Sequence, residues 1–150
     1  MRVLKVFLMT LIGVMVAQEN ANGGPKEDAL QVVERWTQAF TASDVDGIVK
    51  LYSPDALFIG TRSKTVLTTP AQIRQYFEAA LLSDRPRTAT LNSFSANAIS
   101  DSVVVINGLD TVTGVKDGKT ISGRGRVTFV VARQGSNWEI VQFHRSPMPD

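Results

Sequence analysis

The last predicted strand, Trp138 to Ser146, contains the side chains best suited to chemistry, including His144, the only histidine of the 150-residue chain. Side chains of a strand alternate between its two faces, so His144 and its neighbour Arg145 point in opposite directions. Both faces begin apolar and end polar, which is typical of a strand that runs from the core into a pocket or a subunit contact. His144 is therefore a candidate for proton transfer. The alternative is that His144 and Arg145 form the solvated end of a strand.

Asp110 is the second candidate for proton transfer. On its predicted strand it shares a face with Val104 and Ile106, where a carboxylate is costly unless it is paired. Arg124 or Arg126 on the neighbouring strand is a partner of the required charge. Two interpretations of Asp110 therefore stay open: a general base, or one half of a salt bridge across two strands.

Several common kinds of site are absent from the sequence. The chain has no cysteine, which excludes disulfides, thiolate catalysis and cysteine metal sites. One histidine cannot form an H-E-x-x-H zinc site, and the chain has no G-x-S-x-G, G-x-G-x-x-G or Walker pattern. Residues 44–47 resemble the start of a calcium loop but lack the third acidic ligand and the closing glutamate, and helix capping explains them better. We expect no metal site and no cofactor.

Residues 1–17 have the order of a secretory signal peptide: a basic start with Arg2 and Lys5, an apolar run from Val6 to Val16, and the small residue Ala17. The run is shorter than the roughly 20 apolar residues that cross a bilayer. An amphipathic helix or an uncleaved anchor is the alternative. We therefore expect a periplasmic or secreted protein that is not attached to a membrane once the signal is removed.

Removing the signal changes the charge of the protein. The chain has 16 basic and 14 acidic residues, and the loss of Arg2 and Lys5 leaves 14 of each. A protein without net charge has no general electrostatic attraction to nucleic acid or anionic lipid, so we expect neither as a partner. Residues 18–26 contain Gly23-Gly24-Pro25 and are expected to form a flexible lead to one domain, residues 27–150.

Hydrophobic spacing predicts three helices, with one short strand before the third, and then four longer strands. Apolar residues from Ala29 to Phe40 recur at helical spacing. A short second helix is capped by Ser43 and continues to Tyr52, and the third begins with a capping box at Thr69. The predicted helices are 27–42, 44–52 and 70–82, and the predicted strands are 56–59, 88–99, 103–113, 120–133 and 138–146. Helices that precede long hairpin-linked strands indicate the α+β class with an antiparallel sheet.

The last strand also resembles a known family. The segment Trp138 to Ser146 is similar to the closing strand of the calcium/calmodulin-dependent protein kinase II association domain, and Phe-His-Arg-Ser at 143–146 matches that family residue for residue. Segments 126–130 (Arg-Val-Thr-Phe-Val) and 146–149 (Ser-Pro-Met-Pro) resemble bacterial SgcJ/EcaC-type and SnoaL-like proteins. All belong to the nuclear transport factor 2-like superfamily, which the order of helices and strands resembles from Glu27 onward.

This resemblance implies a cone-shaped, cystatin-like fold in which three N-terminal helices cover a curved antiparallel sheet. It also implies a ligand pocket lined by arginines: Arg145 matches one of them, and Arg126 matches the arginine of the bacterial pattern. The association domain's third arginine has no counterpart, since Asn107, Gly108 and Asp110 stand there. Such domains self-associate through their sheets, so the resemblance implies a homodimer or a larger homo-oligomer.

Trp36 and Tyr52 are candidates for lining the same pocket, although aromatic residues at helical spacing usually belong to the core. Three functions stay open. The first is an exported, self-associating cone that binds a small organic ligand, anionic or polar, without catalysis. The second is a small-molecule isomerase, cyclase or dehydratase of SnoaL-like type that uses His144 or Asp110. The third is a purely structural oligomerisation module with a filled cone.

Overall fold

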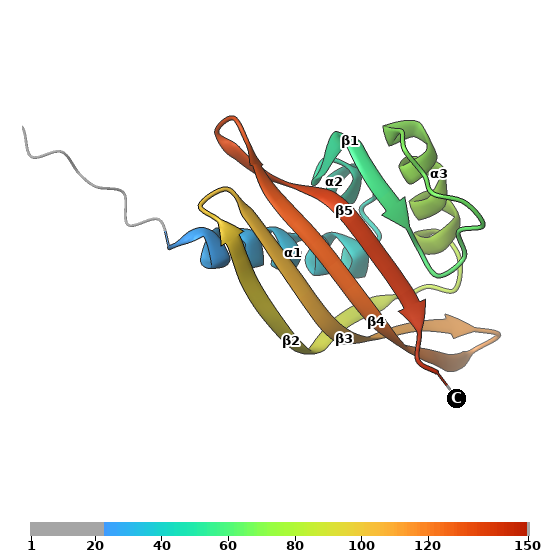
Figure 1. Cartoon of the computed structure of the whole chain (residues 1–150). Coiled ribbons are helices and arrows are strands. Elements are labelled where there is room, and N and C mark those ends of the chain that lie inside the picture. Colours follow the sequence, from blue (N-terminus) through green and yellow to red (C-terminus); the bar gives the residue numbers. More distant parts are fainter. Residues whose placement is uncertain (1–22, 150) are drawn as a thin grey trace, which may run out of the picture.

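The computed structural model describes residues 23–149 (Figure 1). The predicted signal peptide lies outside these residues, and so does most of the predicted lead; its residues 25 and 26 instead begin the first helix, where proline is favoured at the first position. Within 23–149 no helix is long and apolar enough to cross a membrane. The elements in chain order are α1 (Pro25–Ala42), α2 (Val45–Val49), β1 (Tyr52–Ile59), α3 (Pro70–Leu81), β2 (Thr88–Ser100), β3 (Val103–Lys116), β4 (Lys119–Gln134) and β5 (Asn137–Pro147).

The five strands form one curved sheet in the order β1-β5-β4-β3-β2. Neighbouring strands are antiparallel except β1 and β5, which run parallel, so the sheet is mixed and not fully antiparallel as predicted. The chain between β1 and β5 contains α3 and three strands, so no hairpin fixes their relative direction. Figure 1 shows the helices on one face of the sheet, while the other face is uncovered.

The core lies between the helices and the sheet and is rich in aromatic rings. Trp36 of α1 stacks on Phe143 of β5, with ring centroids 5.4 Å apart. Phe143 also stacks on Phe58 of β1 at 4.9 Å and meets Phe129 of β4 edge-on at 5.0 Å. Offset and edge-to-face contacts of this kind stabilise aromatic clusters beyond their buried area. They fix α1 across the middle of the sheet.

Side-chain caps set where the second and third helices begin. α3 starts with the predicted capping box, in which the Thr69 hydroxyl accepts from the backbone N–H of Gln72. The cap of α2 is Asp44, whose Oδ1 accepts from the backbone N–H of Gly47 at 2.8 Å. Ser43, the predicted cap, instead closes α1 in a left-handed conformation with φ of 54°.

Strand β1 is longer than the sequence predicts. It begins at Tyr52, where a continuing helix is predicted, and it includes Ser53-Pro54-Asp55, which is predicted to be a stop signal. β1 is an edge strand, and such strands tolerate proline because one side of them needs no N–H donor. The pairing with β5 shifts register between Tyr52 and Leu57, which accommodates this segment.

β3 and β4 form a long hairpin that extends past the rest of the sheet (Figure 1). Its tip is Asp117-Gly118, with φ of 49° and 73°, as the predicted Asp-Gly turn requires. Near the tip, the backbone N–H of Val115 donates to the carbonyl of Asp84 at 2.8 Å. This bond ties the hairpin to the connection between α3 and β2.

Candidate functional site

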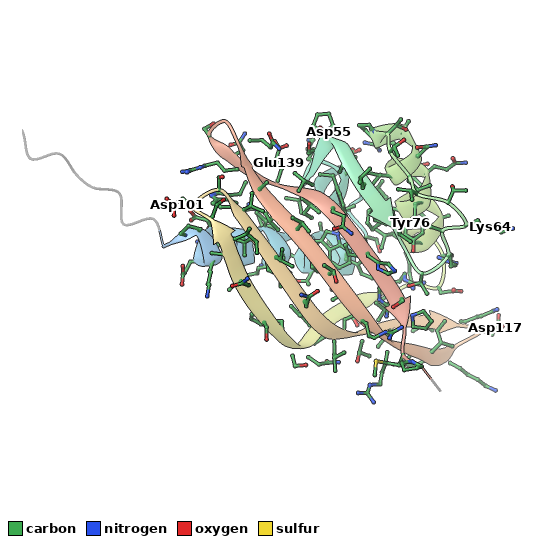
Figure 2. All side chains as sticks on the ribbon, viewed as in Figure 1. Asp55, Lys64, Tyr76, Asp101, Asp117 and Glu139 are labelled. Atoms are coloured by element: carbon green, nitrogen blue, oxygen red, sulfur yellow. The ribbon has the colours of Figure 1, made fainter. Side chains whose placement is uncertain are left out.

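A cavity of about 300 Å³ lies between the β3–β4 hairpin, the end of β5, α3 and the connections that follow β1 and α3. Its basic lining residues are Arg62, Arg87 and Arg145. Figure 2 shows Lys64, in the loop after β1, extending away into solvent. A cavity of this size is at the lower end of the range for small-molecule sites. The other lining residues are Phe40, Thr61, Tyr76, Ala80, Val112, Thr113, Gly114, Ile121, Ser122 and Gly123.

Arg145, near the end of β5, donates hydrogen bonds from all three of its nitrogens. Its Nε donates to Asp110 Oδ2 at 2.7 Å and its Nη2 to Asp110 Oδ1 at 2.9 Å, which makes a bidentate ion pair. Nη1 donates to Thr61 Oγ1 at 2.7 Å, and Nη2 also donates to the carbonyl of Gly123 at 3.1 Å. The Arg145 and Asp110 side chains are 12% and 6% exposed. This planar, charge-assisted pair neutralises itself and holds the guanidinium in place.

The ion pair crosses strand β4, which lies between β3 and β5. Asp110 is opposite Gly125, and a Cβ atom on Gly125 would lie 2.6 Å from Arg145 Cζ and 2.6 Å from Asp110 Oδ1. Arg124 and Arg126 flank this glycine, so they point to the other face of β4, and both are exposed. The prediction that one of them pairs with Asp110 is therefore wrong. The sequence signal was the glycine itself, which inside a strand marks the close approach of another group.

Arg87, just before β2, is as buried as Arg145 but lacks its hydrogen bonds. Its side chain is 12% exposed, and its Nε has no hydrogen-bond partner among residues 23–149. Its Nη1 is 3.8 Å from Asp84 Oδ2, and its Cζ lies 6.0 Å from the centroid of the Phe40 ring. Burial lowers the pKa of Arg87, repulsion from Arg62 lowers it further, and Asp84 partly opposes both. Arg87 therefore carries a positive charge that its surroundings do not fully neutralise.

Arg62 and Arg87 could not be found by sequence reasoning because both lie in irregular connections. Arg62 follows β1 and Arg87 follows α3. Hydrophobic periodicity assigns a face only to residues within helices and strands. No motif or spacing in the sequence marks either residue as part of a site.

Trp36 and Tyr52, predicted as candidates for lining a pocket, lie in the core instead. They are 4% and 7% exposed, and Trp36 Nε1 donates to Tyr52 Oη at 2.8 Å. Burial raises the pKa of Tyr52 well above its ordinary value, so the hydroxyl stays neutral. Neither residue lines the arginine-lined cavity, whereas Tyr76 of α3 does.

His144 and Arg126 lie on the outer face of the sheet, opposite the helices. His144 is exposed and is opposite Thr128 in the β4–β5 register. Arg126 is also exposed and lines an open groove of about 410 Å³ beside Phe94. The alternation of side chains along β5 thus separates His144 from Arg145, as predicted. The structure brings neither His144 nor Arg126 to the arginine-lined cavity.

The lining of the cavity suits anion binding better than proton transfer. Among residues 23–149, the lining includes no histidine, aspartate or glutamate, and both carboxylate oxygens of Asp110 accept hydrogen bonds from Arg145. Arginine side chains stay protonated and can bind carboxylates through two parallel hydrogen bonds. In the described part of the chain, no group of three or more His, Cys, Asp or Glu side chains could hold a metal ion.

Known proteins resemble the chain in both sequence and fold. A family model described as a SnoaL-like domain matches residues 29–150. The structure of a candidate calcium/calmodulin-dependent protein kinase II association domain from Xanthomonas campestris is 26% identical, with a TM-score of 0.76 over 83% of this chain and 88% of that chain. A nuclear transport factor 2-like superfamily protein from Salmonella enterica is 21% identical, with a TM-score of 0.74 over 84% of this chain and 92% of that chain.

More distant structures share the fold alone. A candidate scytalone dehydratase from Novosphingobium aromaticivorans is 8% identical, with a TM-score of 0.73 over 81% of this chain and 83% of that chain. No curated protein matches the chain. Other similar structures have a cystatin-like fold, so the predicted α+β, nuclear transport factor 2-like fold is confirmed.

Proposed function

The chain belongs to the SnoaL-like domain family, and on that premise we propose that it binds a small anionic organic ligand in the arginine-lined cavity. The observation that carries the proposal is Arg87, whose side chain lines the cavity, is 12% exposed and has one ion pair, 3.8 Å long, with Asp84. An anion in the cavity that pairs with this guanidinium completes the neutralisation of its charge and offsets the repulsion between Arg87 and Arg62.

Arg145 supports the same proposal because it holds two parts of the cavity wall in place. Its bonds to Thr61 and to the carbonyl of Gly123 connect the loop after β1 with the β3–β4 hairpin, two parts of the cavity wall. Its bidentate pair with Asp110 anchors both to the middle of the sheet. A preformed wall lowers the entropy that binding must offset.

Proton-transfer catalysis, as in an isomerase, cyclase or dehydratase, has less support. His144 is exposed on the outer face of the sheet, on the opposite side of β5 from Arg145, which lines the cavity. Both carboxylate oxygens of Asp110 accept hydrogen bonds from Arg145, and Asp110 does not line the cavity, so it is not placed to contact a ligand there. Ligand binding needs neither residue to titrate.

We also propose that the protein is exported and that it self-associates through the uncovered face of its sheet. The order of residues 1–17 supports export. The similarity to a candidate association domain supports self-association. Native mass spectrometry at micromolar concentration tests the second point, and a monomer alone would contradict it.

Calorimetric titration with acetate, benzoate and phenylacetate tests ligand binding. Ile121 lines the cavity and is 41% exposed, so Ile121→Glu adds a negative charge to the wall without burying it. We expect this variant to weaken carboxylate binding about tenfold through charge repulsion. Val66→Glu is the matched control, because Val66 is 47% exposed and lies in the loop after β1, outside the cavity. Absence of saturable binding for every carboxylate would refute the proposal.

A further inference from the structure

The charges around the cavity favour a ligand with a single negative charge. Arg62, Arg87 and Arg145 line it, while Asp110 pairs with Arg145 and Asp84 lies beside Arg87. Three positive and two negative charges leave one positive charge in excess. A monoanion balances this excess. A dianion would bring a second charge out of water without a partner, which is costly.

The geometry assigns the binding of that anion to Arg87. Arg145 already uses its Nε and Nη2 for the carboxylate of Asp110 and its Nη1 for Thr61. Arg87 makes one long ion pair, 3.8 Å to Asp84, and its Nε is unpaired among residues 23–149. A carboxylate in the cavity would give the Arg87 guanidinium the close ion pair that Asp110 gives Arg145.

The surroundings of Arg87 determine what the rest of the ligand must be. Its guanidinium lies near the ring of Phe40, and Ala80, Val112 and Ile121 share the cavity wall with it. Apolar surface next to a carboxylate site favours a ligand with an apolar body of matching size, because binding then removes the apolar surfaces of both the ligand and the cavity wall from water. The volume of about 300 Å³ matches a compact body.

We propose that the ligand is a monocarboxylic acid with a compact apolar body, and that Arg87 binds its carboxylate. This inference rests on the proposed function, because it names the chemical class of ligand for the same cavity. It assigns the charge recognition to an arginine in the α3–β2 connection and leaves Arg145 as a positioning residue.

Four probes of similar composition test the inference by calorimetry: benzoate, its neutral isostere benzamide, the dianion phthalate, and acetate, which lacks the apolar body. We expect benzoate to bind at least about tenfold more tightly than each of the others. Tighter binding of phthalate, or equal binding of benzamide, would overturn the inference while leaving a ligand-binding cavity. If none of the four binds, the proposed function itself fails.

Variants of Arg87 test whether this residue binds the carboxylate of the ligand. Arg87→Met should weaken benzoate binding about tenfold or more and leave benzamide binding unchanged, while Arg87→Lys should restore part of the affinity because it keeps the charge but not the planar fork. Arg35→Met is the matched control, since it removes the same charge from an exposed position of α1, away from the cavity and from the uncovered face of the sheet. Thermal unfolding verifies that each variant is folded. Unchanged benzoate binding in folded Arg87→Met would overturn the assignment.

Discussion

Arg145 and Arg87 line the same cavity and are equally exposed, at 12% of each side chain, yet their surroundings differ completely. Arg145 donates four hydrogen bonds, two of them to a buried carboxylate. Arg87 has an unpaired Nε and a carboxylate no closer than 3.8 Å. The fold satisfies Arg145 internally, whereas Arg87 has no such hydrogen bonds among residues 23–149, which is why we propose Arg87 as the residue that binds a ligand.

The difference follows from where each residue lies in the fold. Arg145 is on a strand of the sheet, where the register places it within reach of Asp110 across Gly125. Arg87 is in a connection, outside any register. Residues in connections on a rigid scaffold often carry binding functions. The strand arginine therefore holds the cavity wall together, and the arginine in the connection is the one that we propose for ligand binding.

The largest effect should come from Arg145→Met. Its removal leaves the Asp110 carboxylate, 6% exposed, without its ion-pair partner. Breaking a buried pair in this way lowers the free energy of unfolding by about 3–5 kcal/mol. Urea denaturation of the variant measures the loss. A loss below about 1 kcal/mol would show that the pair is not what stabilises this part of the sheet.

The double variant Arg145→Met, Asp110→Leu distinguishes two effects: the loss of the ion pair itself, and the cost of leaving Asp110 buried without a partner. Replacing both partners removes the buried charge, so we expect most of the lost stability to return. Failure to recover would mean that Arg145→Met acts through its lost bonds to Thr61 and Gly123.

A smaller effect is expected from Gly125→Ala. The new methyl group would lie 2.6 Å from both members of the ion pair, which must shift to admit it. Overpacking of this kind costs about 1–3 kcal/mol. Gly123→Ala is the matched control two residues away on the same strand, since a Cβ there meets nothing within 4 Å. Equal urea midpoints for the two variants would contradict the finding that the Arg145–Asp110 ion pair lies directly over Gly125.

Much of the fold follows from the sequence because its signals are local. The capping box at Thr69 and the Asp117-Gly118 turn have short-range geometries that hold in the structure. The start of β1 cannot be predicted from the sequence, because the apolar residues after Asp46 suit either a helix or a strand. Tertiary pairing with β5 determines that a strand forms there. The parallel direction of that pair is set by the whole chain path, which no local pattern contains.

The candidate site follows from the sequence only in part. Alternation along β5 separates His144 from Arg145, and the cost of a buried carboxylate requires a partner for Asp110. The identity of that partner depends on strand order, because Arg145 reaches Asp110 over the strand between them. The position of Arg87 depends on how the α3–β2 connection packs against the β3–β4 hairpin, which the hydrogen bond from Val115 to Asp84 holds in place. Such long-range contacts leave no periodic trace in the sequence.

The smallest effect on stability should come from Arg87→Met. The substitution removes a buried unpaired donor and its repulsion from Arg62, so without ligand we expect the free energy of unfolding to stay within about 1 kcal/mol of the parent or to rise. Urea denaturation beside Arg145→Met measures the contrast. Because ligand stabilises only a protein that binds it, adding benzoate should raise the urea midpoint of the parent and not of Arg87→Met. A loss as large as that of Arg145→Met would make both arginines structural and remove the distinction between them.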